Sequence, residues 1–204
     1  MISTRLFTIL SSACALLVSA LCPVGFVFAD EPMNVNVAVC NLGGVRAQIV
    51  ADAKAETETV FSSAGVRIVW TACGDISSPA VQARGALFII RLRTDKPPRT
   101  TGPLSLDTMG RAYVADDGGG YLADAYFPAI QAVADHYGGS ASALLGLVIA
   151  HELGHLLRGA GHSLDGVMTT PWRGNEMNAL RKRSLKFSAE DGARIRRALQ
   201  VSER

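Results

Sequence analysis

The sequence has little excess of charge of either sign. Its 204 residues include 20 Lys and Arg and 18 Asp and Glu, so the formal net charge is only +2. A chain whose charges nearly cancel lacks the electrostatic footprint expected of a protein that binds polyanions. The basic cluster Arg181-Lys182-Arg183 is therefore better interpreted as a solvated helical surface, and we expect no nucleic-acid partner.

Long apolar runs are also scarce, and the one at the N-terminus is typical of an export signal. Arg5 provides the positive start, Leu6–Val18 the apolar core and Val27–Ala29 a small-residue cleavage site. We predict a signal peptide over residues 1–29 and a single domain over residues 30–204, in a secreted or periplasmic protein. No second apolar run reaches the roughly 18 residues of a membrane span, so we expect no membrane association after signal cleavage.

Cysteine is scarce as well. The sequence has four, of which Cys14 and Cys22 fall in the predicted signal peptide, leaving Cys40 and Cys73. An even remainder in an exported chain favours a disulfide, and each of the two follows a strand-like run. Neither belongs to a CxxC pair, so a role for them as zinc ligands is the weaker alternative.

Histidine is rare but unevenly distributed, with three of the four histidines inside a window of twelve residues, at His151, His155 and His162. On an α-helix His151 and His155 share one face, so both imidazoles can reach a single Zn²⁺. Glu152, beside them, is placed to take a proton from a water that the metal activates. The alternative is a solvated helix that carries two histidines. The preceding Leu144–Ala150 is apolar all round, however, as in a buried helix, where unpaired polar groups are costly.

The segment that contains these residues resembles the active site of the metzincin metallopeptidases, in which HExxHxxGxxH is followed by a Met-turn. It is also similar to a group of short, secreted bacterial zincin-like proteins. The resemblance implies that His151, His155 and His162 bind zinc and that Glu152 is the general base. It further implies that Met168, in Gly-Val-Met, lies beneath the metal.

One departure from the family pattern concerns the loop before the third histidine. Six residues separate His155 from His162 where the family has five, and Arg158 stands where the family has glycine. Two glycines follow Arg158, and we expect them to let the chain turn one residue later. Glu176 is the alternative third ligand, because another zincin clan takes a glutamate from a later helix.

Alternating strand-like and helix-like patterns predict one α+β domain. The order strand, helix, strand, strand resembles the N-terminal half of metzincin-like proteins, and implies a small twisted mixed sheet packed on a long helix and an active-site helix. In such proteins an edge strand binds the substrate, and Tyr113 and Val114 are the candidates for it. The expected strands are Val35–Val39, Val66–Trp70, Ala86–Leu92 and Arg111–Val114, and the expected helices are Val45–Ala64, Tyr126–Tyr137, Ala141–Arg158 and Ser188–Leu199.

Together these features predict a secreted zinc-dependent metalloendopeptidase, with Zn²⁺ as cofactor and a protein or peptide as substrate. We expect it to be a monomer. Two alternatives retain the zinc site with another function. A binding module that zinc merely stabilises would keep the three histidines but has no need of Glu152. A zinc amidase acting on cell-wall material would need a pocket that the sequence does not reveal.

Overall fold

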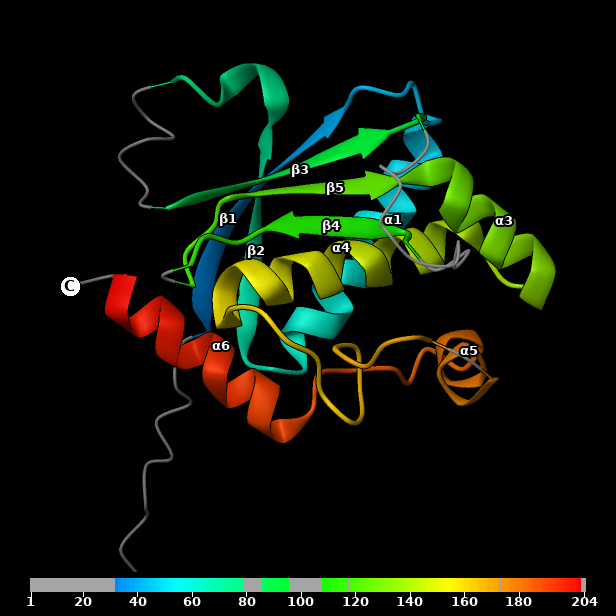
Figure 1. Ribbon diagram of the computed structural model, residues 1–204. Coiled ribbons are helices and arrows are strands. Elements are labelled where there is room, and N and C mark those ends of the chain that lie inside the picture. The colour runs from blue at the N-terminus through cyan, green and yellow to red at the C-terminus, as the bar shows by residue number, and fades with distance from the viewer. Residues whose placement is uncertain (1–31, 79–85, 96–107, 117, 173, 203–204) are drawn as a thin grey trace, which may run out of the picture. The chain divides into compact units, whose positions relative to one another are not determined.

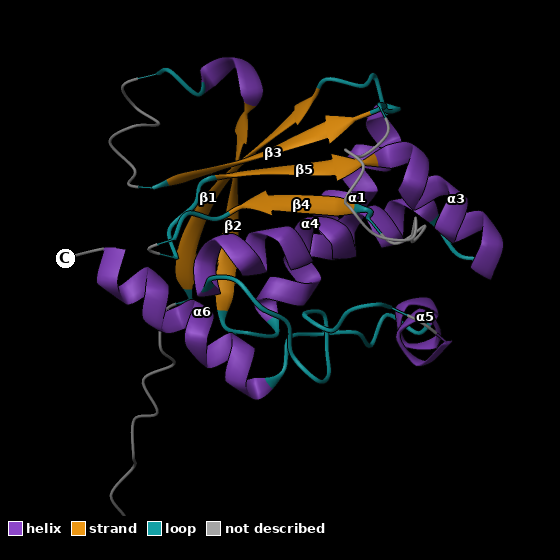
Figure 2. Cartoon of the chain, in the orientation of Figure 1, coloured by secondary structure: helices purple, strands orange, loops and turns teal. Residues whose placement is uncertain are grey.

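A five-stranded sheet is the framework of the domain (Figure 1, Figure 2). The computed structural model describes residues 32–78, 86–95, 108–116, 118–172 and 174–202, and the predicted signal peptide lies outside them. The strand order is β2-β1-β3-β5-β4, in which β4 is an edge strand antiparallel to β5 and the other neighbours pair in parallel. The strands are β1 (Met33–Asn41), β2 (Val66–Ala72), β3 (Leu87–Arg93), β4 (Gly110–Tyr113) and β5 (Leu122–Tyr126).

Two helices pack together against this sheet, the long helix α1 (Ala47–Ser62) and the helix α4 (Ala141–Arg158), which carries the histidine motif (Figure 1). The predicted α+β architecture, a mixed sheet on a long helix and a motif helix, is therefore confirmed. The other helical elements among the described residues are the short 3₁₀ helix η1 (Cys73–Asp75), α3 (Phe127–Tyr137), α5 (Gly174–Arg181) and α6 (Ala189–Ser202).

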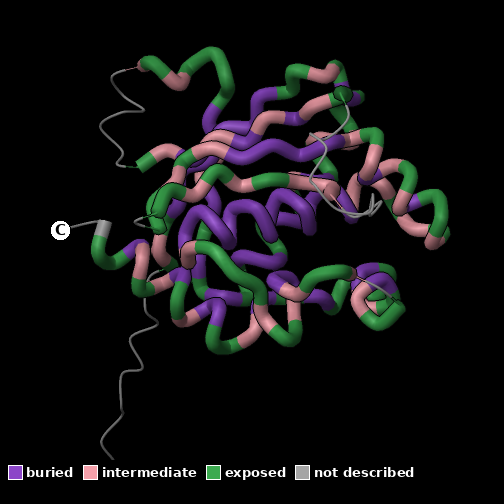
Figure 3. The backbone as a smooth tube through the Cα atoms, in the orientation of Figure 1, coloured by how far each residue is buried: buried purple, intermediate pink, exposed green. Residues whose placement is uncertain are grey.

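Helix α4 is the centre of the core. Every residue from Leu144 to Leu157 is buried, and Figure 3 draws most of α4 in the colour of buried residues. The helix begins after Ser140, whose side-chain oxygen accepts the Ala143 N–H, and it ends before Gly159, whose φ of 88° suits glycine. A helix that is apolar all round has no solvent face, so the polar residues near its end must be satisfied inside the protein.

A glycine lets α1 and α4 approach closely. A Cβ atom built on Gly146 would lie 2.6 Å from the carbonyl oxygen of Ala53 and from the Cβ of Glu56. The Thr57 hydroxyl lies 2.8 Å from the Ala53 carbonyl and 3.0 Å from the Gly146 carbonyl, so it also links the two helices. These contacts fix the point along each helix at which α1 and α4 cross.

A disulfide joins the region around β1 to the segment after β2. Cys40, near the end of β1, is bonded to Cys73, the first residue of η1, with the two Cα atoms 5.1 Å apart. The parallel pairing of β1 with β2 brings these positions together, since Val39 pairs with Ala72.

Three described elements differ from the sequence prediction. Leu122–Tyr126 forms β5, although Tyr126 was expected to begin a helix, and neither η1 nor α5 was among the expected elements. Residues 123–126 of β5 are all buried, so the strand lacks the period-two alternation that reveals a half-buried strand. Within the described part of the chain, none of the helices combines the length and the apolar character that crossing a membrane requires.

We predict that Gly146→Ala destabilises the protein by about 1–3 kcal/mol, because the new methyl group overpacks the crossing of α1 and α4. Alanine is otherwise the better helix former by about 1 kcal/mol. A loss of stability would therefore arise from the close approach of the two helices and not from helix propensity. Urea denaturation measures the change. Gly174→Ala is the matched control, since this helical glycine has no atom within 4 Å of the added Cβ. Equal behaviour of the two variants would contradict the close crossing.

Candidate metal centre

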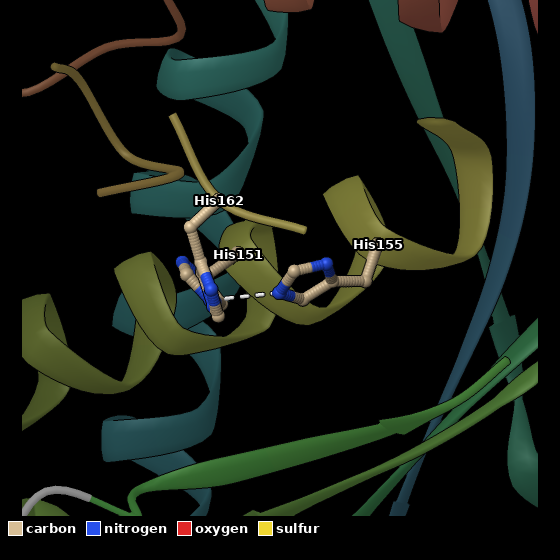
Figure 4. Close-up of side chains that lie close together, drawn as sticks. All are labelled: His151, His155 and His162. Atoms are coloured by element: carbon tan, nitrogen blue, oxygen red, sulfur yellow. Dashed lines mark hydrogen bonds between the residues drawn. The ribbon is translucent and has the colours of Figure 1, made fainter. Parts of the chain in front are cut away.

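Three histidine rings lie together at the C-terminal half of α4 (Figure 4). His151 and His155 come from successive turns of the helix, and His162 comes from the loop that follows it. Each offers a ring nitrogen, and these three atoms lie within 4.8 Å of one another. The structure thus brings together the three histidines that the sequence singled out.

Hydrogen bonds on the far side of the rings orient the two helical histidines. Nδ1 of His151 lies 2.8 Å from the carbonyl oxygen of Val167, and Nδ1 of His155 lies 3.4 Å from that of Gly159. A carbonyl oxygen only accepts, so each ring donates its Nδ1–H and keeps a lone pair on Nε2. The two Nε2 atoms lie 3.1 Å apart, as the dashed line in Figure 4 marks.

This arrangement fits a shared cation. Two lone pairs that converge at this distance repel each other unless a positive group lies between them. Two nitrogens that bind one zinc tetrahedrally at about 2.0–2.1 Å would be roughly 3.3 Å apart, close to the spacing that the structure has. A set of three imidazole nitrogens suits zinc and other borderline transition metals, and not calcium or magnesium.

Burial keeps these imidazoles in the neutral form that binds metals. His151 and His155 are each 9% exposed. Loss of hydration lowers the pKa of His151 to about 3 and that of His155 to about 4. The same cause lowers the pKa of His162, which is the most exposed of the three. At neutral pH no proton has to leave before a cation binds.

Glu152 is buried between α4 and the edge strand β4. Its carboxylate accepts the backbone N–H of Ala112, and burial raises its pKa to about 8, with that hydrogen bond acting in the opposite direction. A Cβ atom on Gly110 would lie 2.7 Å from Cδ of Glu152, so only glycine lets the strand pass this close. The sequence prediction placed Gly110 in a loop and gave no reason to single it out.

The loop after α4 absorbs the additional residue. The helix continues through Arg158, and positive φ angles at Gly159 (88°) and Gly161 (93°) turn the chain back toward the helix. Met168 is fully buried and packs against Gly154, where a Cβ atom would lie 3.1 Å from the Met168 Cε. The methionine therefore lies against the helical turn that carries the two histidines.

The histidines open into a cleft of about 730 Å³ between β4, α3, α4 and the segment after Met168. Val114 lines this cleft, but Tyr113 is not among its lining residues, because its hydroxyl is bonded to Asp124 Oδ2 at 2.8 Å. Trp172 also lines the cleft. It is partly buried against the hydrophobic core, it donates from Nε1 to the Val167 carbonyl, and its ring centroid lies 5.6 Å from that of His151.

The alternative ligand Glu176 lies on α5 and does not belong to the group of converging ring nitrogens. His136, on α3, lines the cleft but is likewise outside that group. Gly110 and Val133 line the cleft but were not among the residues predicted from the sequence. Their position depends on segments that are distant in sequence, and no local pattern marks them.

We predict that the stability of the metal-free chain depends on pH through Glu152. The folded-state pKa of about 8 lies above the ordinary 4.5, so the folded chain retains a proton that the unfolded chain releases between these values. As pH rises through this range, the free energy of unfolding of the wild type should fall relative to that of Glu152→Gln, on the order of a few kcal/mol. Urea denaturation with a chelator present measures this difference.

Glu190→Gln is the control for this measurement, because the Glu190 side chain is 72% exposed. It should follow the wild type across the range. A difference between wild type and Glu152→Gln that stays constant with pH would contradict the buried carboxylate.

Comparison of the sequence with protein-family models gives no match, and comparison with curated proteins gives none. Similar solved structures include metalloproteinase-II from Bacteroides fragilis, with 17% identity over 84% of this chain and a TM-score of 0.48. Another is archaemetzincin from Methanopyrus kandleri, with 14% identity over 85% of this chain and a TM-score of 0.49. The chain spans 55% of the first protein, about half its length, and 99% of the second. The function proposed below rests on the residues of its own site.

Proposed function

We propose that this protein is a secreted zinc-dependent metalloendopeptidase. The observation that carries the proposal is the convergence of three neutral imidazoles beside one buried carboxylate, at the floor of a cleft that an edge strand borders. His151, His155 and His162 would hold the metal, and Glu152 would act as the general base. A purely structural zinc site has no need of the carboxylate, and burying it costs free energy.

A zinc ion held by the three histidines would supply a Lewis acid and would make water easier to deprotonate near neutral pH. The protein's own contribution to proton transfer is Glu152. The Ala112 N–H fixes its carboxylate, and its raised pKa brings it close to the value that suits a base working near neutral pH. It takes a proton from the attacking water and later gives it to the leaving amine.

The proposed substrate is an extended polypeptide that lies along β4. In an antiparallel strand alternate residues direct their N–H and C=O groups to opposite edges. Because Ala112 directs its N–H to Glu152 and not to β5, its carbonyl also faces the cleft side, ready to pair with a substrate strand. An apolar substrate side chain would find an apolar wall, formed by Met109, Val133, Val148, Pro171 and Trp172.

We predict that Glu152→Gln binds one zinc per chain but loses cleavage of an unstructured protein by roughly 10²- to 10⁴-fold, the usual contribution of a general base. A chelator should abolish cleavage by the wild type, and added zinc should restore it. Glu190→Gln, an exposed carboxylate on α6, should cleave like the wild type.

Undiminished cleavage by Glu152→Gln would remove Glu152 from the mechanism. Zinc binding by the wild type, without cleavage of a varied peptide library, would instead favour the zinc-stabilised binding module.

We predict that His162→Ala weakens zinc binding by more than the roughly 100-fold that loss of an outer partner costs, because a direct ligand is removed. Competition with a chromogenic chelator measures the affinity. Glu176→Ala should retain the wild-type affinity, as should His136→Ala, which removes a histidine that lines the same cleft. A large loss in Glu176→Ala together with no loss in His162→Ala would reassign the third ligand.

A further inference from the structure

A buried ion pair joins the end of α4 to the start of α6. Nε of Arg158, the last residue of α4, lies 2.8 Å from Oδ1 of Asp191 in the first turn of α6. The side chains are only 4% and 2% exposed. Removing both charges from water costs free energy, and the attraction between the two charges alone need not offset that cost. A buried pair of this kind therefore calls for a further explanation.

The guanidinium of Arg158 contacts both neighbours of His162 in the sequence, the backbone of Gly161 and the side chain of Ser163. Nη1 donates to the carbonyl oxygen of Gly161 at 2.7 Å, and Nη2 lies 3.5 Å from the hydroxyl oxygen of Ser163. The residues immediately before and after the third histidine are thus held by one planar group.

Asp191 in turn is fixed by its own neighbours. Oδ1 accepts the Ser163 hydroxyl at 2.8 Å, and Oδ2 accepts the Ser188 hydroxyl at 2.8 Å. The Asp191 N–H donates back to the Ser188 side chain at 3.1 Å, which closes a capping arrangement at the N-terminus of α6. Asp191 therefore transmits the position of α6 to the loop that carries His162.

We propose that Arg158 and Asp191 are positioning residues that hold His162 in place for metal binding. This inference rests on the metal centre of the proposed function. The loop is one residue longer than the pattern it resembles, and its two glycines allow the turn without specifying where it ends. The guanidinium of Arg158 sets where the turn ends, because it contacts the chain at Gly161 and at Ser163. It is itself held by the ion pair with Asp191 of α6.

The proposal requires arginine at this position. A lysine would keep the charge beside Asp191, but its single ammonium group cannot reproduce the fixed spacing of the two guanidinium nitrogens that donate to the Gly161 carbonyl and the Ser163 hydroxyl. Ser163 is the shared point of the network, because its oxygen faces Arg158 and its proton goes to Asp191.

The test measures zinc dissociation constants by chelator competition, together with the melting temperature of each metal-free variant. The variants are Ser163→Ala, Arg158→Lys and Asp191→Asn. Each should bind zinc roughly 10- to 100-fold more weakly than the wild type, the usual cost of losing a partner that orients a ligand. Ser163→Ala keeps the ion pair between Arg158 and Asp191. Its zinc affinity therefore measures the contribution of the loop contacts even if the two charge variants unfold.

Asp124→Asn is the matched control. Asp124 is another carboxylate only 2% exposed that pairs with an arginine, Arg91, at 2.6 Å, but it lies in the sheet away from the loop. It should lose thermal stability and keep the wild-type zinc affinity. Loss of melting temperature with unchanged zinc affinity in all three test variants would overturn the proposal, because the pair would then serve only the fold.

A double-mutant cycle separates positioning of His162 from a general effect on the site. In a His162→Ala background, Asp191→Asn should weaken zinc binding no further, since the group that it positions is already absent. An additional loss equal to that in the wild-type background would also overturn the inference. A wild-type chain that binds no zinc would instead refute the metal centre itself, which is a distinguishable result.

Discussion

The structure depends on the need to satisfy polar groups within a fully buried helix. Helix α4 has no solvent face, yet its second half carries two imidazoles and a carboxylate. Each finds a partner outside the helix: His151 on the Val167 carbonyl and His155 on the Gly159 carbonyl, both in the loop that follows, and Glu152 on the Ala112 N–H of β4. The Nε2 atoms of His151 and His155 take no part in these contacts, and their lone pairs converge. Two converging lone pairs suit a metal ion.

Three glycines bring the surrounding elements close enough to make these contacts. Gly146 lets α1 cross α4, Gly154 makes room for Met168 and Gly110 lets β4 pass over Glu152. A Cβ atom at Gly146 would meet the backbone of α1, and one at Gly154 or Gly110 would force the Met168 or the Glu152 side chain to move. The absence of side chains at these points is therefore as much a part of the site as the groups that bind or react.

The third histidine differs from the other two because it does not belong to α4. His162 lies beyond the helix end, in a turn held by Arg158 and by Asp191 of α6. The geometry of the proposed metal centre thus depends on a helix that begins nearly thirty residues further along the chain. Asp191 also forms the hydrogen bonds with Ser188 at the start of α6. The same residue thus stabilises the beginning of that helix and the loop that carries His162.

The sequence alone determined the parts of this protein that depend on local patterns. Helical spacing predicted that His151 and His155 share a face, the apolar run before them predicted a buried helix, and cysteine counting predicted the pairing of Cys40 with Cys73, which are bonded in the structure. Only the tertiary structure decided that β5 is a strand, that Gly110 lines the cleft and that Arg158 pairs with Asp191. The physical reason is that periodicity records which face of an element is buried. The partners that meet on that face come from distant parts of the chain, and packing chooses them.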